Sequence, residues 1–275
     1  MVRYFVRDRL VITFMTKLSR SKLELFTKCP RCFWLDLKHG IKQPSFPPYT
    51  INSAIDYLLK QEFDIYREKG EPHPIMSAAG IEAVPYRSPE MASWRHNFTG
   101  VRYEFQPADF LVYGAVDDVW INPRQELIVV DYKSTGANQH HVRPEYSRQM
   151  SIYQWLLRGN GYVVAPTGYF VFARVNKASG FAANGSGAKG GETGSLGFDI
   201  FVEPLEADSA WVNDALMQAR AVLDSPAPPD PAPECEHCQY RFNAAKIAAQ
   251  TAKQPKAAAP NPKPAGTAKT RKLPL

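Results

Sequence analysis

The sequence LVYGAVDDVWINPRQELIVVDYK, residues 111–133, contains two β-prone runs on either side of a polar segment. Residues 122–125, Asn-Pro-Arg-Gln, are typical of a turn, so the two runs are expected to pair as a hairpin. Successive side chains of a strand point to opposite faces of its sheet. Asp131 and Lys133 should therefore share one face, with Tyr132 on the other.

Acidic side chains and a lysine should meet at one edge of this sheet. The first run contributes Asp117 and Asp118, and the second contributes Asp131 and Lys133. Hard divalent cations prefer oxygen ligands, and a nearby ammonium group can stabilise an anionic transition state or help to activate a water molecule. An Asp-x-Lys at a strand end is also a common surface ion pair, so this motif alone does not assign a function.

The flanking segments predict helices on both sides of the hairpin. In residues 51–69, apolar side chains recur at helical spacing and Gly70 follows as a stop signal, with Asp56 near the apolar stripe. In residues 145–162, Gln149 and Tyr153 stand four apart and share one helix face. Further strands are expected at 101–105, 168–176 and 198–205, and further helices at 19–26 and 208–224.

Three motifs occur in order along this chain: G-A-V-D at 114–117, V-V-D-Y-K at 129–133 and Q-M-S-I-Y at 149–153. Together they resemble the PD-(D/E)XK nuclease superfamily, specifically its RecB-like branch, which carries G-x-x-D, D/E-x-K and Q-x-x-x-Y. The resemblance covers about 18–240. It implies an α/β, restriction-endonuclease-like core in which helices flank a central mixed β-sheet. In this chain, a pair of cysteines also stands near each end of the expected core, as an N- and a C-terminal knuckle.

The resemblance also implies a role for each matching residue. Asp117 and Asp131 would bind Mg²⁺ or Mn²⁺, with the Tyr132 carbonyl as a further ligand. Lys133 would position or activate the attacking water. Gln149 and Tyr153, which share one helix face, would line the catalytic site. Asp117 is preferred to Asp118 as the ligand because it holds the G-x-x-D register.

The first helix departs from the family pattern. The RecB-like branch usually places a metal-binding histidine there, after a glycine, whereas this chain has Asp56 at the corresponding position. A carboxylate also binds Mg²⁺, so activity is not excluded. The helix register makes Glu62 an alternative ligand.

The four cysteines form two C-x-x-C pairs, one near each end of the expected domain: Cys29, Cys32, Cys235 and Cys238. In an intracellular protein, two such pairs predict one tetrathiolate site rather than disulfides. A structural Zn²⁺ fits this pattern. A [4Fe–4S] cluster is the rival, because some RecB-like nucleases join cysteines from both chain ends through one.

The composition predicts a cytoplasmic protein with no membrane segment. Of 275 residues, 44% are hydrophobic, which suffices for a core. The net charge of +6 comes from residues 243–275, because the remainder carries 26 basic and 27 acidic groups. No apolar run is long enough to span a membrane, and the N-terminus lacks a signal-peptide pattern.

We therefore expect three parts: an N-terminal extension (1–17), a nuclease domain (18–242) and a disordered basic tail rich in Ala, Lys and Pro (243–275). The expected function is metal-dependent hydrolysis of DNA phosphodiesters in repair, recombination or defence. Single-stranded or flap-like DNA is the favoured substrate, and a helicase or repair protein is a possible partner. The alternative is a catalytically inactive nucleic-acid-binding or structural member of the same fold.

Overall fold

The computed structural model describes residues 2–6, 9–13, 15–45, 49–137, 142–177 and 196–252, the first two ranges by their backbone alone. The chain divides into two compact units, Met1–Pro233 and Glu234–Leu275.

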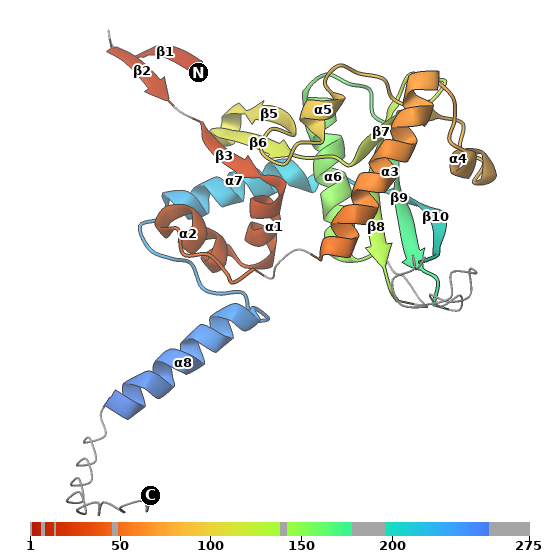
Figure 1. The fold of residues 1–275 in the computed structure, drawn as a ribbon. Helices are drawn as coiled ribbons and strands as arrows, with labels where there is room; N and C mark the ends of the chain where they lie inside the picture. The colour runs from red at the N-terminus through yellow and green to blue at the C-terminus, as the bar shows by residue number, and fades with distance from the viewer. Residues whose placement is uncertain are drawn as a thin grey trace, which may run out of the picture. The chain divides into compact units, whose positions relative to one another are not determined.

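The centre of the first unit is a five-stranded mixed sheet (Figure 1), in the order β10-β9-β8-β7-β4. Strands β8 and β9 are parallel, and the other neighbours are antiparallel. The strand bounds are Val84–Pro85 (β4), Asp118–Ile121 (β7), Leu127–Thr135 (β8), Thr167–Val175 (β9) and Phe198–Glu206 (β10). Helix α6, Pro144–Gly159, provides the crossover that the parallel pair requires.

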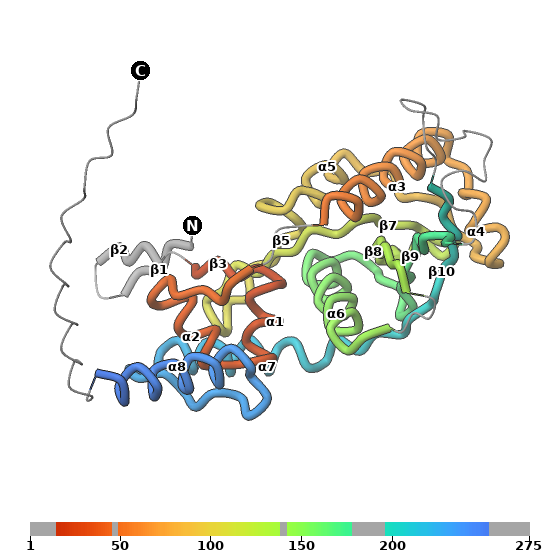
Figure 2. The backbone as a smooth tube through the Cα atoms, turned by 60° about the horizontal axis from the view of Figure 1, so that its bottom comes forward, coloured from red at the N-terminus to blue at the C-terminus, as the bar shows by residue number. Residues whose placement is uncertain are grey.

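Helices cover both faces of this sheet. Helix α3, Thr50–Lys69, lies on one side of strands β7, β8 and β9, and α6 lies on the other (Figure 2). Val129 belongs to the buried cluster that includes the apolar residues of α6, whereas Val130 belongs to the cluster that includes those of α3. The predicted alternation along β8 is thereby confirmed, as is the α/β class with helices flanking a central sheet.

A three-stranded sheet stands beside the first, in the order β3-β6-β5. Its strands are Thr16–Ser19 (β3), Val101–Phe105 (β5) and Phe110–Gly114 (β6). Helices α1 (Arg20–Lys28), α2 (Pro30–His39) and α7 (Trp211–Asp224) pack together next to it. The Ser19 hydroxyl caps α1 by accepting a hydrogen bond from the Lys22 amide, as expected of a serine before a helix.

The run 111–120 does not form one strand, which differs from the expectation. It divides into β6 and β7, in two different sheets, with residues 115–117 between them. β7 alone forms the expected hairpin with β8, and Gln125 adopts a left-handed φ of 62° in the predicted turn. The run divides because β6 pairs with β3, a strand distant in sequence, and with β5, the strand just before it.

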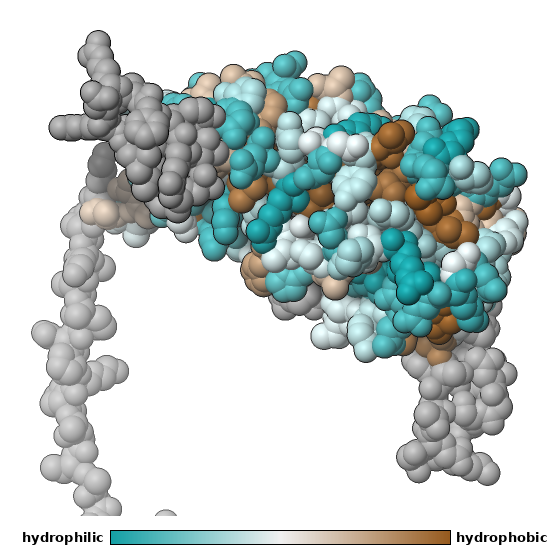
Figure 3. Space-filling model, turned by 90° about the horizontal axis from the view of Figure 1, so that it is seen from above, coloured by the Kyte–Doolittle hydropathy of each residue, from teal (hydrophilic) through white to brown (hydrophobic). Residues whose placement is uncertain are grey.

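The remaining elements of the first unit are short: β1 (Val2–Val6), β2 (Arg9–Thr13), α4 (Pro74–Ala78), α5 (Met91–Trp94) and a 3₁₀ turn at Gln106–Ala108. On the face shown in Figure 3, hydrophobic residues are interspersed among hydrophilic ones. None of the described helices is long and apolar enough to cross a membrane.

In the second unit, helix α8 spans Glu236–Ala252. It extends nine residues beyond Asn243, into the segment for which the sequence predicted disorder. The Ala-rich composition of 243–252 explains this difference, since alanine is the strongest helix former. Residues 253–275 of the expected tail lie outside the described residues.

Candidate active site

Asp117 and Asp131 face each other at the end of the β7–β8 pair. Asp118 lies opposite Val130 in the ladder, so the same register places Asp117 opposite Asp131. The Tyr132 amide donates a 3.0 Å hydrogen bond to Oδ2 of Asp117. A carboxylate just before β7 and a carboxylate of β8 thus meet at one edge of the sheet.

Asp131 is the buried member of this carboxylate pair, with 1% of its side chain exposed. Its Oδ1 accepts a 2.6 Å hydrogen bond from Nε2 of Gln149. Its Oδ2 contacts the Lys133 ammonium as an ion pair but makes no hydrogen bond of normal geometry. Burial raises the pKa of Asp131 to about 7; Lys133 opposes this rise and Asp117 adds to it.

Lys133, Gln149 and Tyr153 form a continuous polar chain behind Asp131. The Lys133 ammonium donates to Oε1 of Gln149 at 3.4 Å, and Gln149 Nε2 also donates to the Tyr153 hydroxyl at 3.1 Å. The Lys133 ammonium lies 4.8 Å from the centroid of the Tyr146 ring. Burial raises the pKa of Tyr153, so this phenol remains protonated at neutral pH.

Gly114, the last residue of β6, allows helix α6 to approach this strand closely. A Cβ atom at Gly114 would lie 2.7 Å from Cε1 of Tyr153, closer than real side chains approach. The glycine of G-A-V-D and the tyrosine of Q-M-S-I-Y are therefore in direct contact. This packing accounts for the glycine without any contact to a ligand.

Asp118 is fully buried and points away from Asp117, into an ion-pair network. Its Oδ2 accepts a 2.7 Å hydrogen bond from the Tyr132 hydroxyl, and its Oδ1 pairs with the guanidinium groups of Arg67 and Arg95. Arg95 Nε also donates to the backbone carbonyl of Asp117 at 2.9 Å. The network therefore holds the backbone that carries Asp117, while Asp118 itself is inaccessible to a ligand.

Lys60 of helix α3 links Asp56, on the same helix, to Asp117. Lys60 belongs to none of the three sequence motifs. The Lys60 ammonium lies 2.7 Å from Oδ2 of Asp56 and 3.2 Å from Oδ1 of Asp117. Burial and the Asp117 charge raise the pKa of Asp56, although Lys60 opposes them. The i, i+4 spacing of Asp56 and Lys60 was the available signal, because such pairs share a helix face.

Glu62, the alternative ligand on this helix, pairs with His73 instead. Its Oε1 lies 2.9 Å from Nε2 of His73, and that ring stacks on Phe63 at a centroid distance of 4.4 Å. The first helix thus brings Asp56, and not Glu62, into contact with the groups around Asp117.

A polar cleft of about 490 Å³ opens beside these groups. Side chains or backbone of α3, β8 and α6 line it, with Asn97 beyond them. The lining includes Asp56, Lys133, Ser134, Tyr132 and Tyr146. A carboxylate, an ammonium group and aromatic faces are therefore accessible within one cleft.

The donor set at this edge fits a hard divalent cation. Asp117 and Asp131 supply facing carboxylates, Asp56 a third nearby, and the elevated pKa of Asp131 reflects carboxylate repulsion and burial that a cation would relieve. Such a cation can act as a Lewis acid towards a phosphoryl oxygen or lower the pKa of a bound water.

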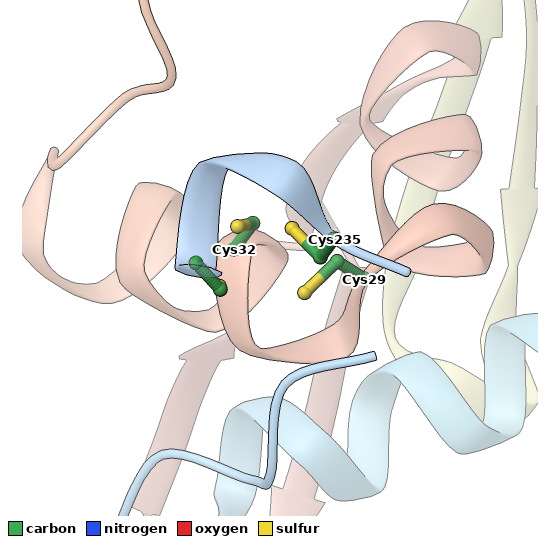
Figure 4. Close-up of side chains that lie close together, drawn as sticks. Cys29, Cys32 and Cys235 are labelled. Atoms are coloured by element: carbon green, nitrogen blue, oxygen red, sulfur yellow. The ribbon is translucent and has the colours of Figure 1, made fainter. Parts of the chain in front are cut away.

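The cysteines of the two C-x-x-C pairs lie close together (Figure 4). The Sγ atoms of Cys29, Cys32, Cys235 and Cys238 all lie within 4.8 Å of one another. Figure 4 labels three of these residues, Cys29, Cys32 and Cys235. Four thiolates form a donor set for Zn²⁺ or an Fe–S cluster.

Comparison with known proteins now adds to this geometry. The model of the PD-(D/E)XK nuclease superfamily matches residues 54–242. None of the curated proteins matches the chain. Among the solved structures, one titled "Crystal structure of SSO0001" matches with a TM-score of 0.40 and 14% sequence identity, over 86% of this chain and 87% of that one. Most members of the matching superfamily are nucleases, which act on nucleic acids and typically use divalent metals. Since the family model covers more than half of its length, this chain belongs to the PD-(D/E)XK nuclease superfamily.

Proposed function

We propose that this protein is a metal-dependent DNA nuclease of the RecB-like branch, with its catalytic centre at Asp117, Asp131 and Lys133. The observation that carries the proposal is the convergence of two facing carboxylates, an ammonium group and the Gln149 amide beside a polar cleft. In the reaction, a water oxygen bonds to phosphorus while one P–O ester bond breaks, leaving a phosphate monoester and a hydroxyl group.

Asp117 and Asp131 would hold Mg²⁺ or Mn²⁺, with Asp56 and the Tyr132 carbonyl as further ligands. The cation would supply Lewis acidity and a water of lowered pKa. Lys133 would stabilise the added negative charge on the phosphoryl group, because its ammonium reaches the cleft and is anchored on the Tyr146 ring. Gln149 would orient Asp131 and Lys133, since its amide bonds to both side chains.

A second candidate function is non-hydrolytic binding of nucleic acid. Lys60 favours it, because its ammonium group already neutralises Asp56 and Asp117. A binding protein of this fold retains the cleft and its Lys133 ammonium group but does not need a metal at the two facing carboxylates.

The deciding experiment is cleavage of end-labelled single-stranded, flap-containing and double-stranded DNA, and of RNA, with Mg²⁺, with Mn²⁺ or with EDTA. Wild type is compared with Asp131→Asn. Asp230→Asn is the matched control, because Asp230 is an exposed carboxylate in the loop after α7.

The nuclease proposal expects metal-dependent products from wild type and the control, and none from Asp131→Asn. Preference for single-stranded or flap DNA is expected. If folded wild type binds DNA but releases no product with either metal, the binding function replaces it.

For the four cysteines we propose a structural Zn²⁺ or [4Fe–4S] site that stabilises the protein and takes no part in hydrolysis. Metal analysis with a visible absorption spectrum of anaerobically purified protein distinguishes them, since an iron–sulfur cluster contains iron and absorbs visible light, whereas Zn²⁺ is colourless. A cytoplasmic location, a role in repair, recombination or defence, and a helicase partner remain predictions.

A further inference from the structure

We propose that Lys60 is a built-in counter-ion that competes with the catalytic metal for Asp56 and Asp117, and so sets the metal concentration at which the site fills. This inference rests on the proposed function, because it concerns the same carboxylates. It assigns a regulatory role to a residue outside the three sequence motifs.

The first observation is that one ammonium group serves two carboxylates from different elements. Lys60 Nζ lies 2.7 Å from Oδ2 of Asp56, on its own helix, and 3.2 Å from Oδ1 of Asp117, which precedes β7. Its side chain is only 21% exposed, whereas those of exposed surface lysines are mostly in water. Lys60 is therefore a fixed part of the site.

The second observation is that core packing of the helix fixes the backbone position of Lys60. Leu59 and Phe63, on either side of it in the helix, are buried in the cluster formed with the sheet. Since α3 is anchored there, the position of the Lys60 Cα is set by core packing. Only rotation of its own side chain can remove the ammonium from the carboxylates.

The third observation concerns Asp117, both of whose oxygens already have partners. Oδ2 accepts from the Tyr132 amide and Oδ1 accepts from Lys60. An ammonium group has donors only, so it cannot itself become a metal ligand. A divalent cation bound to Asp117 would stand next to Lys60, and the two positive charges would repel each other in a half-buried site.

It follows that filling the metal site costs the energy of displacing Lys60, or of holding two cations together. Removing the Lys60 charge should therefore tighten metal binding, and it should destabilise the metal-free protein by leaving Asp56 and Asp117 without their shared partner. The opposite sign is expected if Lys60 instead helps by orienting Asp56 towards the metal.

The test is Mn²⁺ binding to the intact protein, freed of loosely bound divalent ions and with its cysteine site left loaded, followed by electron paramagnetic resonance of free Mn²⁺. Lys60→Met keeps the alkyl length and removes the charge. Lys69→Met is the matched control, because Lys69 is an exposed lysine on the same helix. The melting temperature of each protein is measured without and with saturating Mn²⁺.

Lys60→Met is expected to bind Mn²⁺ about tenfold more tightly than wild type, a coupling of ordinary size between neighbouring charges. Without metal it should melt below wild type, and Mn²⁺ should raise its melting temperature by a larger increment. Lys69→Met should match wild type. Adding Asp117→Asn to Lys60→Met should abolish the gain in affinity, which locates the effect at this site.

Equal or weaker Mn²⁺ binding by Lys60→Met overturns the counter-ion role and leaves the nuclease proposal standing. If neither wild type nor Lys60→Met binds Mn²⁺ at this site, the proposed metal-dependent function fails, and the Lys60 role fails with it. Binding by Lys60→Met alone supports the competition in its strongest form.

Discussion

The backbone amide of Tyr132 donates a 3.0 Å hydrogen bond to the carboxylate of Asp117, so the strand that carries Asp131 and Lys133 also fixes the carboxylate opposite them. The alignment of the two carboxylates depends on main-chain geometry as well as on side-chain packing. Substitutions of side chains at the cleft should therefore change its chemistry while leaving its frame in place.

Replacement of Lys133 by methionine tests this separation. Cleavage should fall by about 10²- to 10³-fold, the usual cost of removing one group that stabilises a developing anion. The melting temperature should change little, because the methionine side chain can still pack on Tyr146 and because Asp131, whose pKa is already raised to about 7, can take up a proton when its ion pair with Lys133 is lost. The DNA affinity should also change little. Cleavage kinetics, calorimetry and a DNA-binding assay measure the three quantities. Lys42→Met, at an exposed lysine, is the control. A Lys133→Met protein that melts far below wild type would contradict the prediction.

Gly114→Ala should destabilise the first unit by about 1–3 kcal/mol, the range for overpacking a close contact. The added methyl group would lie 2.7 Å from the Tyr153 ring, which is buried and cannot move away freely. Urea unfolding measures the free energy. Gly136→Ala, where a Cβ meets nothing within 4 Å, should be nearly neutral. Equal stabilities of the two variants would refute the packing argument.

The stability of the metal-free protein should fall as the pH rises from about 4 to about 7, through the titration of Asp131. Its folded pKa of about 7 exceeds the ordinary aspartate pKa of 3.8, so in this window the folded protein holds a proton that the unfolded chain releases. The stabilisation is complete below pH 3.8 and lost above pH 7. Asp131→Asn cannot titrate, so its melting temperature should fall less over the same window. Parallel melting curves against pH, in EDTA, for both proteins would disprove the assignment.

Cys235→Ser should lower the metal content and the melting temperature together, since a thiolate site needs its four ligands and its binding energy adds to folding energy. Elemental analysis and calorimetry on the same preparation test this. Ser77→Ala, at an exposed serine, is the control. Ser225→Ala is unsuitable, because the Ser225 hydroxyl donates a hydrogen bond to the backbone carbonyl of Ala227. A Cys235→Ser protein with unchanged metal content would argue against a shared site.

The elements around the site were predictable where local pattern governs them. The apolar spacing of α3 and its end at Gly70, which has the left-handed φ of 69° typical of a helix stop, are confirmed. The opposite faces of Asp131 and Tyr132 are confirmed as well, because alternation follows from strand geometry. The match to the superfamily model confirms the resemblance at superfamily level, and the RecB-like assignment stays a prediction.

What could not be predicted depends on contacts between residues far apart in sequence. The division of 111–120 into two strands follows from the pairing of β6 with β3, which the run itself does not encode. The buried partners of Asp118 come from α3 and from the segment after α5, and no motif links them. Lys60 was missed for a related reason, since its contact with Asp117 joins positions 57 apart in the chain.

The opposite directions of Asp117 and Asp118 make this site unusually sensitive to the loss of one residue. Deleting a single residue between Gly114 and Asp117 would shift the pairing register of β7 against β8 by one residue. A shift of one residue moves every side chain of a strand to the opposite face of the sheet. An acid would then reach the cleft only by removing the buried carboxylate that Arg67 and Arg95 share, which would leave both arginines paired with Asp64 alone. Length, and not only residue identity, is therefore under constraint in this segment.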